Sequence, residues 1–377
     1  MVQPNPFIIT ADYQGPEYFC DRVRETETLE NNIANGRNTV LVSSRRMGKS
    51  GLIAHVFERE LVKKNFRSFS IDLYPTSSLA EMILLLAKEI TEPLKSREQK
   101  FAETFLSVVK SLRPGFKVDP VTGQFVFDLS LGEIVRPAES LAEIFQYLEK
   151  SETPCLVAID EFQKIADYPD KHVIELLRTH VQKCRQTWFI FAGSDRRMME
   201  KLFNNPTEPF YMSCSPLYLD AIEYQSYLDF AQRHFEKADK NLEEACFRQV
   251  YDLFEGHTWY VQRLMNELYA WTKAGETADP ELLSSVLPYV VKTYARTFQE
   301  QMSQMPESHK QLLIAIAKEG RAEQVTSIAF CKKYAMKSPS TVQSALRSLH
   351  EDGTVNRIGN AYYVTNRLLS LWLKTAY

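Results

Sequence analysis

The most restrictive feature of the sequence is a short apolar run, a polar loop and an amphipathic helix in direct succession. The apolar run TVLV at residues 39–42 predicts a buried strand, and the loop SSRRMGKS after it ends in Gly48, Lys49 and Ser50. Backbone N–H groups at a helix N-terminus, a lysine and a hydroxyl are the groups that bind a phosphate chain and its Mg²⁺. The segment therefore predicts a phosphate-binding loop with Lys49 on the phosphates and Ser50 on the metal.

This loop departs from the Walker A pattern G-x-x-x-x-G-K-S/T at its first position, where Ser43 replaces glycine. Glycine there supplies backbone freedom, so Ser43 implies an altered turn. A GKS tripeptide also occurs by chance, and by itself it fits an ordinary solvated helix start. If the loop binds nucleotide, the contacting residues are expected to be Ser44, Arg45, Arg46, Met47, Gly48, Lys49, Ser50 and Gly51.

A second apolar run, CLVAIDE at residues 155–161, predicts a buried parallel strand that ends in two carboxylates. Asp160 is expected to hold the water shell of Mg²⁺, and Glu161 to polarise an attacking water. The alternative is a solvated turn after a core strand. This strand and the loop together favour a nucleotide site, because the carboxyl ends of parallel strands meet at one edge of a sheet.

A third run, WFIFAGS at residues 188–194, predicts another buried strand. If this strand lies between the first two, Ser194 would stand beside the terminal phosphate and orient the lytic water. Arg196 or Arg197 could then stabilise charge on the transferred phosphoryl group. An ordinary helix cap with solvated arginines remains the alternative for each arginine.

The 377 residues leave room for two or three domains at about 150 residues each. After an arm at residues 1–17 with the apolar clip FII, short β-rich runs alternate with amphipathic helices over residues 18–220. This alternation predicts an α/β domain with a mainly parallel sheet flanked by helices. Residues 221–301 are predicted to be helical. Residues 302–377 are predicted to form three helices and a β-hairpin, the pattern of a winged helix-turn-helix.

Five strands are predicted for the parallel sheet, at residues 39–42, 68–73, 155–159, 188–192 and 211–218. A further hairpin is predicted at residues 114–128, with its turn at residues 120–123, as an insertion into the α/β domain.

Composition excludes several classes of protein. The net charge of −3 does not fit a polycationic coat for nucleic acid, and no apolar run approaches the roughly 18 residues of a membrane span. The N-terminus lacks the basic and apolar regions of a signal peptide. Six scattered cysteines without a C-x-x-C pair predict a reducing, cytoplasmic compartment and no zinc site.

The C-terminal segment is basic. Residues 301–377 carry ten lysines and arginines against five acidic residues, or +5, which leaves −8 on residues 1–300. Such asymmetry is typical of phosphate contact, and the residues expected to face duplex DNA are Lys332, Lys333, Lys337, Gln343 and Arg347. Alternatively, this module packs on the rest of the chain or on a protein partner. Both interpretations stay open.

Several strings resemble one family: YFCDRVRETETLENNIANGRNTVLVSSRRMGKSGLI, LVAIDEFQKI, FIFAGSDRRMM and EGHTWYVQRL. They are similar to the STAND-class P-loop ATPases of bacteria and archaea, which share a core fold with the AAA+ origin-recognition initiators. The resemblance covers nearly the whole chain. It implies a P-loop NTPase domain, then a helical lid domain and a winged helix.

The resemblance also implies further nucleotide contacts. The family's Phe-x-x-Arg segment near the adenine matches Phe19, Cys20, Asp21 and Arg22, with Glu25 as the partner of Arg22. A glycine-x-proline element of the lid matches Gly256 and His257, with threonine where proline is expected. A histidine after glycine at a helix start is otherwise a capping or solvated residue.

Three functions follow from these features. The first is an ATP-binding switch that slowly hydrolyses ATP to ADP and phosphate. The second is a DNA-associated factor, similar to an initiator, that uses ATP for assembly. The third is a scaffold without catalysis that holds ADP as a structural ligand. A protein partner or nucleotide-dependent self-association is compatible with each of them.

Overall fold

A computed structural model describes residues 5–9, 13–91, 109, 116–118, 125–127, 134 and 136–377. The chain divides into two compact units. The first unit spans Thr10–Ile222, and the second combines Met1–Ile9 with Glu223–Tyr377. Each unit is described by itself below. Among the described helices, none combines the length and the apolar character that a membrane crossing requires.

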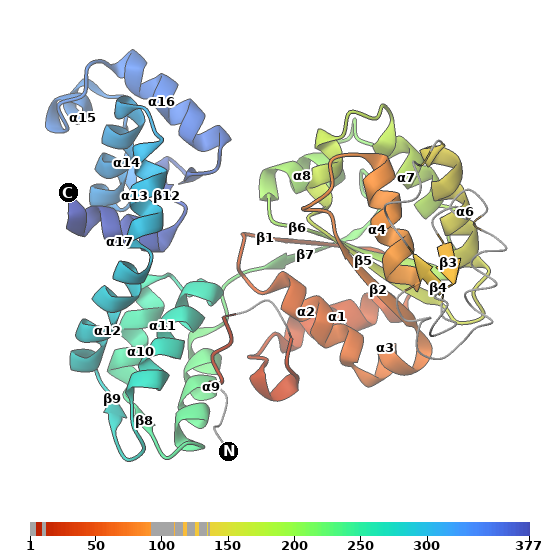
Figure 1. Ribbon diagram of the computed structural model, residues 1–377, viewed down its shortest axis with the longest axis horizontal. Coiled ribbons are helices and arrows are strands. Elements are labelled where there is room, and N and C mark those ends of the chain that lie inside the picture. The colour runs from red at the N-terminus through yellow and green to blue at the C-terminus, as the bar shows by residue number, and fades with distance from the viewer. Residues whose placement is uncertain are drawn as a thin grey trace. The chain divides into compact units, whose positions relative to one another are not determined.

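The first unit is built on a five-stranded parallel sheet in the order β2-β5-β6-β1-β7 (Figure 1). The strands are β1 (Thr39–Ser43), β2 (Arg67–Asp72), β5 (Cys155–Asp160), β6 (Thr187–Gly193) and β7 (Ser215–Leu219). β6 lies between β5 and β1, which is the arrangement that the proposed place of Ser194 requires. The fifth strand starts later than predicted, because the residues before Ser215 form turns, with Met212 in a left-handed conformation at φ 50°.

Helices cover both faces of this sheet (Figure 1). One face carries α1 (Val23–Ala34), α2 (Lys49–Glu58) and α3 (Glu60–Asn65), and the other carries α4 (Leu79–Thr91), α6 (Pro137–Glu149), α7 (Val173–Val181) and α8 (Arg196–Asn204). Successive strand residues point to opposite faces, so Leu41 joins the core under α1 and α2 while Val40 and Val42 join the other. The predicted α/β fold is confirmed.

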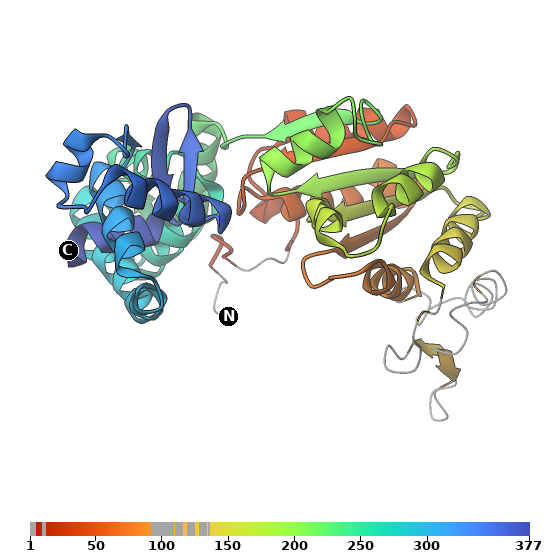
Figure 2. The ribbon, with the colours of Figure 1, turned by 90° about the horizontal axis from the view of Figure 1, so that it is seen from above.

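The predicted insertion is present as the antiparallel pair β3 (Phe116–Val118) and β4 (Phe125–Phe127). Figure 2 shows this short gold hairpin outside the parallel sheet, on the side of α4 and α6. The turn predicted at residues 120–123 lies outside the described residues.

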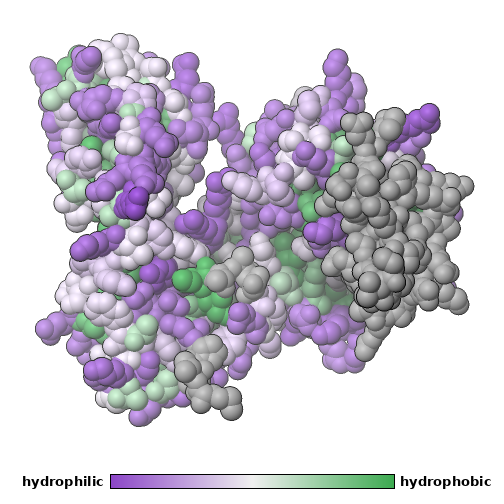
Figure 3. Space-filling view, viewed as in Figure 1, coloured by the Kyte–Doolittle hydropathy of each residue, from purple (hydrophilic) through white to green (hydrophobic). Residues whose placement is uncertain are grey.

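The second unit begins with the N-terminal arm packed on helices. These are α9 (Tyr224–Glu236), α10 (Glu244–Leu253), α11 (Thr258–Trp271), α12 (Pro280–Thr293) and α13 (Ala295–Ser303), with β8 (Asn241–Leu242) and β9 (Thr277–Ala278) as a two-stranded pair. Phe7 is 0% exposed and contacts the rings of Phe235 and Tyr269. Asn266 Nδ2 donates to the carbonyl of Phe7 at 2.7 Å. In Figure 3, which has the same view as Figure 1, a hydrophobic patch lies where Figure 1 places residues 5–9.

The second unit ends in a winged helix. Its helices are α14 (Glu307–Glu319), α15 (Ile328–Lys333), α16 (Pro339–Glu351) and α17 (Arg367–Ala376), and its sheet has the order β10-β12-β11. The strands are β10 (Ala322–Glu323), β11 (Val355–Ile358) and β12 (Ala361–Val364). Ser338 caps α16, since its Oγ accepts from the N–H of Thr341 at 3.3 Å, with Pro339 at the first helical position.

Candidate functional site

The loop between β1 and α2 has the backbone shape of an anion cradle. Arg46 and Gly48 take left-handed conformations, at φ 65° and 95°, and Gly48 caps α2. Left-handed residues turn the chain so that successive N–H groups face one concavity, and the first N–H groups of α2 have no partner within the helix. Ser44, Arg45, Arg46, Gly48 and Ser50 are exposed, whereas Met47 and Lys49 are buried.

Ser43 does not distort this loop. It is the last residue of β1, extended and paired with Leu219 of β7, and its Oγ donates to the carbonyl of Ser44 at 3.0 Å. The left-handed backbone is needed only further along, at Arg46 and Gly48. The altered turn expected at Ser43 is therefore unnecessary, because a strand conformation suits serine as well as glycine.

Lys49 joins the two strand ends that the sequence singled out. Its side chain is 6% exposed, and its Nζ lies 3.5 Å from Asp160 Oδ1 and 3.5 Å from Glu161 Oε1. Ser50 Oγ donates to Asp160 Oδ2 at 2.6 Å. A buried ammonium needs such partners, because an unpaired buried charge costs about 3–5 kcal/mol. The structure thus brings together two pairs of neighbouring residues from distant parts of the chain, with Ser50 and Asp160 separated by 110 positions.

Both carboxylate oxygens of Glu161 have partners. Lys49 contacts Oε1, and two further side chains donate to Oε2. Ser194 Oγ, just beyond β6, donates to Glu161 Oε2 at 2.6 Å, and Gln163 Nε2 donates to the same oxygen. Glu161 itself is left-handed, at φ 52° and ψ 38°, where it caps the 3-10 helix η4 (Phe162–Asp167). A left-handed conformation costs about 1–2 kcal/mol in a residue with a Cβ, and such strain concentrates at functional sites.

Gln163 was not singled out from the sequence. Its side chain is 7% exposed, and among the described residues none donates to its buried Oε1. That oxygen packs against Gly193, where a Cβ would overlap both Gln163 and Met199. A buried acceptor without a donor costs about 1–3 kcal/mol. The only local sign of this residue in the sequence is its place two positions after Glu161.

Asp72 is a third carboxylate at this edge that sequence reasoning missed. It ends β2 directly opposite Asp160. Burial raises its pKa, as do the charges of Asp160 and Glu161, while the N–H of Tyr74 and the charge of Lys49 oppose that rise. The sequence does show an acidic residue at the end of the strand SFSID. Its place beside Asp160 could not be predicted, because it depends on the pairing of β2 with β5.

The segment before α1 is tied to the loop. Asp21 and Arg22 are both left-handed, at φ 54° and 62°, which turns the Arg22 side chain inwards. Its guanidinium pairs with Glu25 at 2.9 Å, as expected, and donates to the carbonyl of Met47 at 3.2 Å. The neighbouring Cys20 is buried.

Phe19 lies over the first turns of α2. Its ring stacks on that of His55 with centroids 4.1 Å apart, and a Cβ on Gly51 would lie 3.9 Å from the Phe19 ring. The contacts of Phe19 and Arg22 therefore bring this segment to the loop between β1 and α2.

Arg196 makes its described contacts with other residues, and Gly256 and His257 belong to the other unit. Arg196 pairs with Glu200 at 2.8 Å, lies over the ring of Tyr218 and has a side chain that is 65% exposed. This matches the alternative of a solvated arginine after a helix cap, since Asp195 caps α8. Gly256 and His257 lie in the second unit, where His257 stands at the N-cap of α11.

The winged helix exposes the predicted polar face of α16. Gln343 and Arg347 are exposed, and the opposite face buries Val342, Ala345, Leu346 and Leu349. Lys332, Lys333 and Lys337 are exposed too, and Lys333 forms an ion pair with Glu319. Hydrophilic residues predominate over this part of the molecule in Figure 3.

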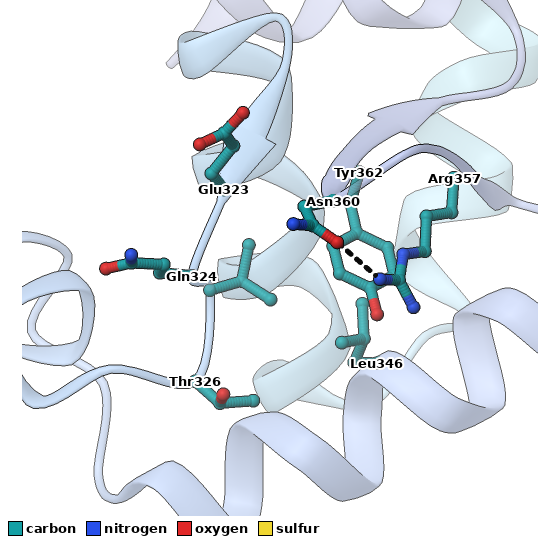
Figure 4. Close-up of a pocket in the computed structure, with 8 residues that line it drawn as sticks. Glu323, Gln324, Thr326, Leu346, Arg357, Asn360 and Tyr362 are labelled. Carbon is teal, nitrogen blue, oxygen red and sulfur yellow. Dashed lines mark hydrogen bonds between the residues drawn. The ribbon is translucent and has the colours of Figure 1, made fainter.

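The winged helix also carries a pocket between its sheet and α16 (Figure 4). Leu346 and Tyr362 provide apolar lining, while Arg357 and Asn360 come from the wing. The guanidinium of Arg357 donates to Asn360 Oδ1 at 2.9 Å and to the carbonyl of Gly359 at 2.6 Å. These bonds hold the wing turn in place.

Comparisons with known proteins agree with this fold. Residues 19–264 match the family described as "ATPase domain predominantly from Archaea", and residues 296–375 match the one described as "Probable winged helix domain". No curated protein matches the sequence significantly.

Solved structures share the fold at low sequence identity. The Walker-type ATPase PABY2304 of Pyrococcus abyssi is similar with a TM-score of 0.65 and 17% identity, over 98% of this chain and 99% of that one. The ORC2 protein of Aeropyrum pernix, solved as ADPNP–ADP complexes, gives 0.60 and 14%, over 97% and 95%. The ORC1 protein of the same organism, solved in complex with DNA, gives 0.53 and 13%, over 96% and 94%.

The raised pKa of Asp72 predicts a stability change with a defined pH dependence. The folded state binds the Asp72 proton more tightly than the unfolded chain, whose aspartate has the ordinary pKa of 3.8. The ionised carboxylate therefore destabilises the fold at neutral pH, and this effect fades as pH falls through the folded pKa. Asp72→Asn should raise the Tm of the nucleotide-free chain at pH 7, with a gain that shrinks on acidification.

Asp167→Asn is the matched control, because Asp167 pairs with Lys164 on the surface of the same unit. It should bring no gain in Tm at pH 7. A lower Tm for Asp72→Asn at pH 7 would show that Asp72 stabilises the charged cluster.

Proposed function

Because the chain belongs to the family of ATPase domains found predominantly in Archaea, we propose that it binds ATP or ADP with Mg²⁺ and slowly hydrolyses ATP. The observation that carries this proposal is the meeting of Lys49, Ser50, Asp160 and Glu161 at the carboxyl edge of the sheet. We infer a nucleotide-dependent switch of the STAND class from the motifs that resemble that family.

The phosphates are proposed to lie in the loop of residues 43–51, at the N-terminus of α2. The left-handed backbone at Arg46 and Gly48 fits an anion cradle, because it frees N–H groups to face the ligand. Lys49 then exchanges its two carboxylate partners for phosphate oxygens. This exchange keeps the buried ammonium paired throughout, which the Coulomb cost of an isolated charge requires.

Ser50 and Asp160 are the residues that would hold Mg²⁺, Ser50 through its hydroxyl and Asp160 through the water shell of the ion. Their side chains already lie together, since Ser50 Oγ donates to Asp160 Oδ2 at 2.6 Å. Mg²⁺ usually takes only one or two protein ligands besides phosphates and water. When bound, the ion would neutralise charge on the phosphate chain.

Glu161 is proposed to polarise the attacking water, with Ser194 orienting it. Both side chains stand at the edge where the terminal phosphate would end, and they already share a hydrogen bond of 2.6 Å. Lys49 would stabilise charge on the transferred phosphoryl group.

The base of the nucleotide is proposed to lie against residues 19–22. Phe19 supplies an aromatic surface next to α2, and Arg22 fixes this segment to the loop through the carbonyl of Met47. Gly256 and His257 remain proposed contacts from the lid. Arg196 could serve only if its side chain left Glu200.

The proposed role of Glu161 predicts a separation of binding from turnover. Glu161→Gln should bind Mg·ATP nearly as tightly as the wild type, because the amide still accepts hydrogen bonds from Ser194 and Gln163. Hydrolysis should fall at least tenfold, about 1.4 kcal/mol of barrier or more, in a phosphate-release assay.

Glu175→Gln is a suitable control, since Glu175 lies exposed on α7 of the same unit and pairs with His172 at 3.4 Å. Equal turnover in the wild type and Glu161→Gln would place any activity elsewhere. A wild type that binds ADP without turnover would favour the scaffold function.

A second candidate function is ATP-dependent association with duplex DNA. The exposed polar face of α16 favours it, with Lys332, Lys337 and Arg347 free of the apolar core. The ORC1 protein of Aeropyrum pernix, whose fold is similar, was solved with DNA bound. Contacts of this kind would be made mainly to phosphates, so they would be weak and sensitive to salt.

The DNA hypothesis predicts a salt-dependent binding constant for the full chain, with a log–log slope of about −0.9 per phosphate neutralised. Lys337→Glu combined with Arg347→Glu should flatten this slope and leave ATP binding intact. Lys63→Glu with Lys64→Glu changes the charge equally on α3 of the other unit, and it should retain the slope. If the full chain does not bind DNA at low salt, the exposed face of α16 would instead be assigned to a protein partner.

A further inference from the structure

We propose that Gln163 is the positioning residue that fixes Glu161 for water activation, a role that rests on the proposed hydrolysis of ATP. Three donors hold the Glu161 carboxylate: Lys49 at Oε1, and Ser194 and Gln163 at Oε2. With both oxygens engaged, the carboxylate has one orientation. Of the three donors, Gln163 has no other proposed task.

The other two donors are expected to leave Glu161 when the nucleotide is bound. Lys49 would move to phosphate oxygens, which removes the ionic contact now measured at 3.5 Å. Ser194 would share its hydroxyl with the attacking water. The Gln163 amide would then be the remaining fixed contact on Glu161, just when the orientation of the carboxylate decides the rate.

The surroundings of Gln163 show that packing alone does not explain a glutamine there. Its side chain is 7% exposed, and among the described residues its Oε1 has no donor. An apolar side chain of similar length would avoid that buried acceptor, as methionine does in irregular core space. A buried glutamine that leaves its own Oε1 without a donor in the described part of the chain, while its Nε2 donates to Glu161, fits a functional role.

Gly193 makes this arrangement possible. It ends β6 immediately before Ser194, and any Cβ there would overlap both the Gln163 amide and the Met199 side chain. The missing side chain lets Gln163 reach Glu161 alongside Ser194. Residues from two neighbouring strand ends therefore converge on the same carboxylate oxygen.

The test compares Gln163→Met with the wild type in Mg·ATP binding, steady-state hydrolysis and thermal unfolding. The proposal expects kcat to fall at least tenfold, with the Kd for ATP within about twofold of the wild type. It also expects little change in Tm, because removal of the buried Oε1 offsets the lost hydrogen bond to Glu161. A residue with a merely structural role would instead lower the Tm and weaken binding together.

Gln232→Met is the matched control. Gln232 is a partly buried glutamine of α9 whose Nε2 donates to the carbonyl of Leu242 at 3.2 Å, in the other unit. This change should leave kcat unaltered. A double mutant with Glu161→Gln adds a second control, since Gln163→Met should bring little further loss once the carboxylate is gone.

Wild-type kcat in Gln163→Met, or losses that multiply in the double mutant, would overturn the proposed role of Gln163 while ATP hydrolysis stands. A wild-type chain that binds ATP without hydrolysing it would overturn the hydrolysis itself, and the role of Gln163 with it.

Discussion

A single buried ammonium organises the candidate site. Lys49 is 6% exposed, and its Nζ forms ion pairs with Asp160 and Glu161 at 3.5 Å each. These carboxylates end β5, while Lys49 follows β1, so the contact passes over the end of β6, which lies between them. The parallel sheet is what makes this possible, because it brings all three carboxyl ends to one edge. Ser50, Ser194 and Gln163 complete the cluster from the same three strand ends.

The same pairing sets conditions on the proposed chemistry. Lys49 is already paired with two carboxylates, so phosphates would have to compete with Asp160 and Glu161 for the ammonium. Mg²⁺ would favour the phosphates in this competition, because Asp160 would then interact with the ion instead of with Lys49. Glu161 also has a left-handed backbone, and the donors on its carboxylate restrict that group to one orientation. An exchange of partners at each binding event suits a switch that retains its nucleotide better than an enzyme of rapid turnover.

Much of this site could be predicted from local sequence. The GKS loop and the strands ending in Asp160-Glu161 and Ser194 each have a recognisable pattern, and parallel strands bring their carboxyl ends together whatever lies between them. Asp72 could not be assigned, because its meaning depends on β2 lying beside β5. The contact of Gln163 with Glu161 depends on the left-handed backbone at Glu161 and on the missing side chain at Gly193. Secondary-structure propensities do not predict either feature. The docking of Phe7 among rings from α9 and α11 likewise depends on contacts made more than 220 positions along the chain.

The central claim is that Lys49 binds the phosphates of a nucleotide. Calorimetric titration of Mg·ATP into the wild type, Lys49→Ala and Lys63→Ala tests it most directly, because Lys63 is an exposed lysine of α3 whose partner is Glu58. The account predicts one site per chain in the wild type and in Lys63→Ala, and no measurable binding in Lys49→Ala. Thermal unfolding of each variant shows that it remains folded. Unchanged affinity in a folded Lys49→Ala chain would contradict the assignment of the site.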